Sequence, residues 1–270
     1  MVTTLTKKGY VTINNPENFK IYYEIHGKEG KETNKLLFIM GLFNTTLSWK
    51  PQTEYFGNHP DYQLCVFDNR GVGWSDAPFG LYSTSQMAQD VVKLLEHLDW
   101  TENIHVIGIS MGGMIAQELA LAKPHYIKSL CLTSTSPGRS LTPEFLATPA
   151  PEGSPHKTYE DIFTENFLDR ISKTRKQPIK AACLRHYVSP SKLEQIKNNI
   201  SHILVATGTW DNLVKPQNSF YLAKHLGVDV KCWEGSGHVL SNEQPKKYNE
   251  MLEKHFRNAC EMRDNDEVVK

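Results

Sequence analysis

The chain alternates short apolar runs with longer segments in which apolar residues recur every three or four positions. A short run rich in Val, Ile and Leu is typical of a strand buried on both faces, and the longer spacing predicts amphipathic helices. Strand-like runs cover residues 36–40, 64–67, 104–107, 127–132, 203–207 and 228–233. Strands that alternate with helices predict an α/β fold with a mainly parallel central sheet flanked by helices on both faces.

The two ends of the chain extend this pattern. Residues 10–13 and 20–27 are β-rich and surround a turn, which predicts an opening hairpin. A surface helix is expected over residues 85–98, capped by Thr84 or Ser85. A final helix is expected from about residue 244 to residue 257, with the chain frayed after residue 262.

Between these regions the composition changes. Residues 137–201 are rich in proline and contain helix-like patches at 159–171, 179–187 and 192–200. We therefore expect a short helical cap at 137–201, inserted into a core formed by residues 1–136 and 202–270.

Residues 104–122 predict a buried strand that passes through a sharp turn into a helix. Ser110 stands at the turn, and Gly108 and Gly112 lie two positions away on either side. Glycines at these positions permit a strained, positive-φ serine and close packing of the helix on the strand. The pattern G-x-S-x-G in this context predicts a nucleophile elbow, although a serine in a turn is also a common structural feature.

A serine hydroxyl needs a base and an orienting acid to act as a nucleophile. Asp211 directly follows a predicted strand, at the edge where functional groups gather in open α/β sheets. His238 follows the glycine pair of a loop after the last strand. The chain order Ser110, Asp211, His238 is the one expected for this elbow.

Each of these residues has an alternative role. Asp211 could cap a helix beginning near Pro216, in which case Asp229 or Asp68 would be the acid. His238 could be an ordinary loop histidine among the 11 histidines of the chain.

Acyl transfer also requires donors for the developing oxyanion. The N–H of Met111, directly after the serine, points toward the same space. The second donor is expected to be the N–H of Leu42, because Gly41 lets the backbone approach the substrate. The alternative is that Gly41 is a simple turn glycine.

Residues 68–76 follow another predicted strand and combine polar with turn-forming side chains. We interpret them as a scaffold for the neighbouring loops, with Arg70 buried against carboxylates. A phosphate-binding role is disfavoured, because the glycine spacing differs from G-x-G-x-x-G and no Lys-Ser/Thr pair follows.

Charge and composition indicate no charged macromolecular partner. The 30 basic and 30 acidic residues give a formal net charge of zero, so neither nucleic acid nor an anionic membrane is indicated. No apolar run approaches the roughly 20 residues that span a bilayer, and the N-terminus lacks the apolar core of a signal peptide. Five scattered cysteines suit buried thiols in a reducing compartment. We expect a cytoplasmic protein, either monomeric or homodimeric.

Taken together, the segments 68–76, 108–113 and 237–238, with Asp211, resemble the α/β-hydrolase superfamily. The resemblance is strongest to its esterase, methylesterase, enol-lactonase and cofactor-free haloperoxidase branch. Members usually carry His-Gly before the oxyanion residue, whereas this chain has Met40-Gly41, a variant similar to methylesterase-like members. Serine at position 110 argues against the related dehalogenases and epoxide hydrolases, which use aspartate there.

The resemblance implies a carboxylesterase-like serine hydrolase that cleaves an ester, lactone or thioester of a small molecule without a metal or an organic cofactor. Apolar residues near the expected site favour a largely apolar substrate, with Gly41, Phe43, Trp210 and Val239 as binding residues. The alternative is that many of the apolar side chains only pack the cap against the sheet. One alternative is a prolyl-aminopeptidase-like enzyme, for which Glu160, Asp161 or Glu165 would bind the substrate amine. The other is a hydrolase-fold ligand receptor with little turnover.

Overall fold

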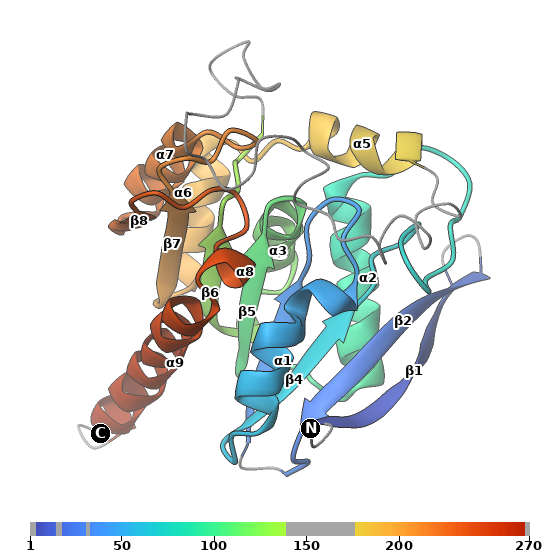
Figure 1. Ribbon diagram of the computed structural model, residues 1–270, viewed down its shortest axis with the longest axis horizontal. Helices are drawn as coiled ribbons and strands as arrows, with labels where there is room; N and C mark the ends of the chain where they lie inside the picture. The colour runs from blue at the N-terminus through green and yellow to red at the C-terminus, as the bar shows by residue number, and fades with distance from the viewer. Residues whose placement is uncertain (1–3, 15–17, 31–32, 139–175, 268–270) are drawn as a thin grey trace.

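A computed structural model describes residues 4–14, 18–30, 33–138 and 176–267, and these residues contain one eight-stranded sheet (Figure 1). Its strand order is β1-β2-β4-β3-β5-β6-β7-β8. The strands are β1 (Leu5–Asn14), β2 (Asn18–Gly27), β3 (Asn34–Ile39), β4 (Tyr62–Phe67), β5 (Ile104–Ile109), β6 (Ile127–Thr133), β7 (Ile203–Gly208) and β8 (Val230–Trp233). The predicted α/β fold is confirmed.

The sheet is parallel except at one edge. Strands β1 and β2 form the predicted hairpin, and β2 pairs antiparallel with β4. All remaining pairs, from β4 through β3 to β8, are parallel. Parallel strands end at the same edge, so the loops after β3, β5, β7 and β8 share one side of the molecule.

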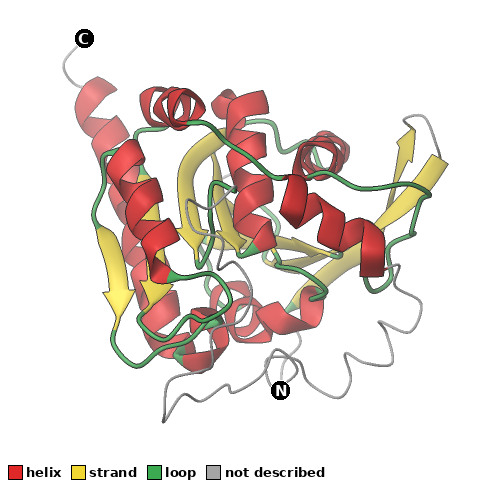
Figure 2. Ribbon diagram, turned by 90° about the horizontal axis from the view of Figure 1, so that it is seen from above, coloured by secondary structure: helices red, strands yellow, loops and turns green. Residues whose placement is uncertain are grey.

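Helices cover both faces of the sheet (Figure 2). The α-helices are α1 (Lys50–Gly57), α2 (Thr84–His97), α3 (Met111–Ala122), α5 (Lys176–Arg185), α6 (Pro190–Asn199), α7 (Pro216–Leu226), α8 (Leu240–Glu243) and α9 (Pro245–Glu267), with 3-10 turns η1 (Thr46–Trp49) and η2 (Pro124–Tyr126). Among the described residues, no helix is long and apolar enough to cross a membrane.

The strand periodicity of two divides the core into two clusters. On β3, Leu37 packs with residues of α2, α3, α6 and α7, whereas Leu36 and Phe38 pack with residues of α1, α8 and α9. Successive strand side chains point to opposite faces, and both faces are covered. This arrangement explains why the central strands are continuous apolar runs.

Two predicted helix ends are wrong. Ser83, rather than Thr84 or Ser85, caps α2, because Ser83 is the residue with extended backbone. Its hydroxyl accepts from the Gln86 N–H while the Gln86 side chain accepts from the Ser83 N–H, which is a capping box. The last helix continues to Glu267, ten residues beyond the expected end at 257. Helices α1 and α8 were not anticipated from the sequence.

The predicted cap falls partly outside the described residues, since the patch 159–171 is not among them. The patches at 179–187 and 192–200 correspond to α5 and α6. Helix α6 buries Leu193 and Ile196 in the core cluster shared with α3 and α7. The division of the chain into core and cap stays a prediction.

Candidate active site

Ser110 lies between the end of β5 and the start of α3, and its backbone has a positive φ, with φ 56° and ψ −123°. This conformation is unfavourable for a non-glycine residue and requires support from its surroundings. The support is present: the Ser110 N–H donates to the Thr133 carbonyl at 3.0 Å, and the Ser110 carbonyl accepts from Thr135 Oγ1 at 2.7 Å. Hydrogen bonds to Thr133 at the end of β6 and to Thr135 just after it therefore stabilise the turn, which the neighbouring glycines permit.

Two glycines permit the close packing around this serine. A β-carbon at Gly112 would collide with the backbone carbonyl of Ile39, so only glycine lets α3 begin against the end of β3. A β-carbon at Gly41 would lie 3.0 Å from Ser110 Cβ and 3.5 Å from Ser110 Oγ. The loop after β3 therefore passes directly beside the serine, at the position expected for an oxyanion donor.

Asp211 and His238 lie in contact. Both side chains are buried, and His238 Nδ1 is 2.8 Å from Asp211 Oδ2. The second oxygen, Oδ1, accepts from the N–H groups of Leu213 at 3.0 Å and Val214 at 2.8 Å. These bonds fix the carboxylate in one orientation. The N-cap position of α7 is occupied by Lys215, so Asp211 does not cap that helix.

The loops that carry these two residues are interlocked. The Trp210 N–H donates to the Ser236 carbonyl at 2.9 Å, and the Gly235 N–H donates to Thr209 Oγ1 at 2.9 Å. Since β7 and β8 pair in parallel, their loops leave the same edge of the sheet and these bonds tie them together. The Asp211–His238 contact follows from this pairing.

The competing acids occupy other positions. Asp68 is fully buried and accepts from the N–H groups of Thr46 at 2.8 Å and Trp74 at 2.9 Å, so its carboxylate holds two loops. Asp229 is exposed and precedes β8, at the sheet edge opposite to His238. Neither arrangement supplies an acid to the His238 imidazole.

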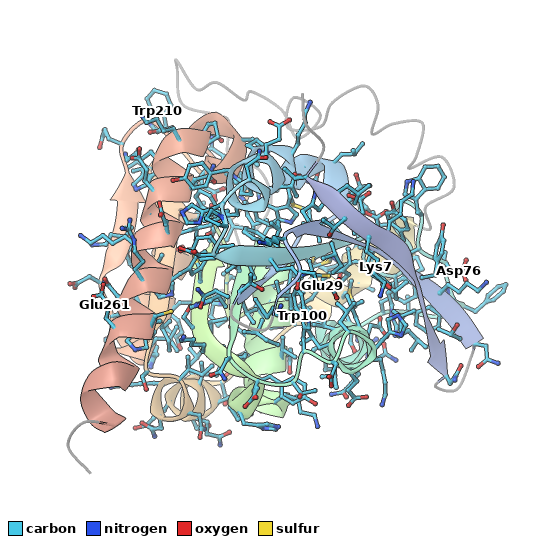
Figure 3. All side chains as sticks on the ribbon, turned by 90° about the horizontal axis from the view of Figure 1, so that it is seen from below. Lys7, Glu29, Asp76, Trp100, Trp210 and Glu261 are labelled. Carbon is cyan, nitrogen blue, oxygen red and sulfur yellow. The ribbon has the colours of Figure 1, made fainter. Side chains whose placement is uncertain are left out.

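The segment 68–76 is a scaffold, as predicted. Arg70 forms a bidentate pair with Asp90, both distances being 2.6 Å, and both side chains are buried. The rings of Phe19 and Tyr82 lie 4.8 Å and 5.5 Å from the Arg70 guanidinium. The segment ends at Asp76, on the opposite side of the molecule from Trp210 (Figure 3).

The apolar candidates for the substrate site differ in how far they are buried. Phe43 is buried, has φ 61°, and carries the Lys180 ammonium 6.0 Å from its ring centroid. Leu42 and Trp210 are partly exposed. Val239 is buried in the core cluster that includes α8 and α9. Met111 is fully buried at the start of α3.

Burial raises the pKa of the Cys131 and Cys183 thiols to about 12, which keeps these two thiols protonated near neutral pH. The described part of the chain contains no group of three or more His, Cys, Asp or Glu residues that could hold a metal ion.

One contact near His238 was missed from the sequence. The Glu243 carboxylate accepts from the N–H groups of Gly237 at 2.6 Å and Val239 at 3.0 Å. In the sequence, the only indication of this contact is that Glu243 lies five residues after His238. That spacing alone does not distinguish Glu243 from other acidic residues.

Ser110 stands on a positive-φ turn between a strand and a helix, and a buried Asp–His pair lies on the loops that leave the same end of the parallel strands. A serine on such a turn is typical of a nucleophile elbow. A family model described as "alpha/beta hydrolase fold" matches residues 34–177, more than half of the chain. The chain belongs to the α/β-hydrolase fold family.

Known proteins support this assignment. 3-Oxoadipate enol-lactonase 2 of Acinetobacter baylyi is 24% identical over 241 residues, which is 83% of this chain and 89% of that protein. The RutD protein of Azorhizobium caulinodans is 33% identical over 114 residues, and this match spans 42% of the chain but only 40% of the relative. A thermophilic esterase from Thermogutta terrifontis superposes with a TM-score of 0.75 at 21% identity, covering 94% of this chain and 99% of that one. At that identity the superposition shows the fold alone.

Proposed function

We propose that this hydrolase cleaves a carboxylic ester, lactone or thioester of a small, largely apolar molecule through an acyl-enzyme on Ser110. The observation that carries the proposal is the positive-φ Ser110 at the end of the parallel strands whose loops also hold the His238–Asp211 pair. The relatives support the hydrolase class, since one is named an enol-lactonase and another an esterase.

In the proposed mechanism Ser110 Oγ attacks the carbonyl carbon while His238 Nε2 accepts its proton. Asp211 accepts from Nδ1–H and so keeps Nε2 free as the base. The tetrahedral oxyanion is bound by the N–H groups of Met111 and Leu42. The imidazolium protonates the leaving alcohol or thiol, and water activated by His238 then releases the acid.

The substrate lies, in this proposal, against Gly41, Phe43, Trp210 and Val239, beneath a cap formed within residues 137–201. Gly41 brings the oxyanion loop next to Ser110, and Phe43 and Trp210 offer aromatic surface. The acids considered for an aminopeptidase, Glu160, Asp161 and Glu165, lie outside the described residues.

The experiment is steady-state hydrolysis of p-nitrophenyl esters from acetate to octanoate, with the wild type beside Ser110→Ala and His238→Ala. We expect wild-type turnover with a burst, and a loss of at least about a thousandfold in either variant. Hydrolysis that survives Ser110→Ala would remove the serine from the mechanism. If the folded wild type does not hydrolyse the p-nitrophenyl esters, the same preparation is tested with prolyl and lactone substrates. Hydrolysis of a prolyl substrate would favour the peptidase, hydrolysis of a lactone would favour a narrow lactonase, and no hydrolysis of either would favour the receptor.

A further inference from the structure

The two peptide N–H groups on either side of His238 are bound by a single carboxylate. Gly237 N–H donates to Glu243 Oε2 at 2.6 Å and Val239 N–H donates to Glu243 Oε1 at 3.0 Å. Each oxygen takes one donor, so the carboxylate bridges the backbone of the residue that carries the imidazole. Residues 237–239 are all buried.

Glu243 is itself held in place. It ends α8, a single turn next to α9 in Figure 1 whose first residue, Leu240, is fully buried. The Ser241 carbonyl accepts from Gln52 Nε2 at 3.0 Å, and Asn242 Nδ2 donates to the Ser48 carbonyl at 3.0 Å. Helix α8 is thereby fastened to η1 and α1, the elements that follow the Gly41 loop.

The other bonds to this loop do not involve these two N–H groups: the Val239 carbonyl, for example, accepts from the N–H groups of Asn242 and Glu243, both at 2.9 Å. Gln244 Nε2 donates to Ser236 Oγ, and the Ser236 carbonyl accepts from the Trp210 N–H. The Gln244 and Trp210 bonds hold Ser236, whereas the N–H groups of Gly237 and Val239 are bound by Glu243. Loss of this carboxylate leaves two N–H groups unpaired in a buried loop, which then moves to find other partners.

From this geometry we infer that Glu243 is a positioning residue for His238, which it holds by its backbone while Asp211 orients its ring. The inference rests on the proposed function only for its kinetic consequence. Glu243 bonds the backbone rather than the imidazole, so it is expected to act on the reacting geometry more than on substrate binding.

The test compares Glu243→Ala and Glu243→Gln with Glu250→Ala, a matched change at an exposed glutamate of α9. Alanine removes both acceptors, whereas glutamine keeps one acceptor oxygen and turns a donor toward the second N–H. We expect kcat for p-nitrophenyl esters to fall about 100-fold in Glu243→Ala and about tenfold in Glu243→Gln, with KM within about threefold of wild type. Glu250→Ala should match the wild type.

Hydrogen–deuterium exchange supplies a second readout that needs no turnover. Exchange of the peptide covering residues 235–240 should accelerate in Glu243→Ala while β5 and α3 remain protected. A folded Glu243→Ala protein with wild-type kcat, or with unchanged exchange in this peptide, overturns the inference. A wild type without Ser110-dependent turnover would instead refute the proposed function, and the exchange result would still decide the role of Glu243.

Discussion

One carboxylate oxygen of Asp211 contacts the His238 imidazole, and the other accepts hydrogen bonds from two backbone N–H groups. The 2.8 Å contact from Oδ2 to His238 Nδ1 coexists with two N–H bonds to Oδ1, from Leu213 and Val214. The acid therefore cannot rotate without breaking three interactions, and the ring nitrogen that faces it is held in one place.

Replacement of Asp211 by Asn tests this orientation. An amide can present its NH₂ group to Nδ1, which favours the tautomer with the proton on Nε2 and removes the base. We expect kcat to fall about a thousandfold to ten-thousandfold, with little change in stability, because asparagine is isosteric. Ester kinetics and urea unfolding of the same preparations measure the two effects. Near-wild-type kcat would show that Asp211 does not set the tautomer.

Gly41→Ala tests the approach of the β3 loop to the serine. The added methyl group would lie 3.0 Å from Ser110 Cβ and 3.2 Å from the Ile109 carbonyl, so the loop must retreat from the position proposed for the oxyanion donor. We expect kcat/KM to fall about 10- to 100-fold. The control is Gly30→Ala, whose methyl group meets, among the described residues, only Thr33 Cγ2, at 3.6 Å. Equal kinetics of the two variants would place the oxyanion site elsewhere.

Arg70→Ala tests the buried ion pair beneath the loops. It leaves the Asp90 carboxylate buried without its bidentate partner, so we expect a loss of about 3–5 kcal/mol in the free energy of unfolding. The double variant Arg70→Met/Asp90→Leu removes both charges and should recover most of this loss. Urea denaturation measures both, and Lys93→Ala, which breaks an exposed pair with Glu96, should change stability little. A double variant as unstable as Arg70→Ala would contradict the uncompensated-charge explanation.

Because the His105 ring is buried, we expect the protein to lose stability in acid. Its ring is buried in β5, with Nδ1 2.7 Å from Ser129 Oγ, and burial lowers its pKa from 6.5 to about 3. Below pH 6.5 the His105 side chain binds a proton in the unfolded chain but not in the folded protein. The free energy of unfolding therefore decreases as the pH is lowered from about 6.5 to about 3. His186 and His255, with pKa values lowered by burial to about 3 and about 4, add to this fall.

The measurement is urea unfolding of the wild type and His105→Gln at about pH 7.5 and about pH 5.5. The difference in unfolding free energy between the two pH values should be smaller by about 1.4 kcal/mol in the variant, whatever its absolute stability. Equal pH dependence in both proteins would mean that His105 does not titrate differently on folding.

Local pattern alone determined a large part of this protein. The apolar runs specify buried strands because both faces of a parallel sheet are covered. The spacing around Ser110 specifies its positive-φ turn because glycines permit the close packing on either side. These features depend on neighbours within a few residues, so a single sequence contains the necessary information. The Arg70 scaffold was also foreseen, although its partner Asp90 was not.

Only the tertiary structure decided which distant groups meet. Asp211 and His238 are 27 residues apart, and their contact exists because β7 pairs in parallel with β8. Ser83, and not one of its neighbours, caps α2 because it has the extended backbone of an N-cap residue. Glu243 contacts the His238 loop because α8 packs on α1 and η1. The amino-acid types at these positions are common on any surface. Their roles come from packing and strand register, which bring together residues that no local pattern connects.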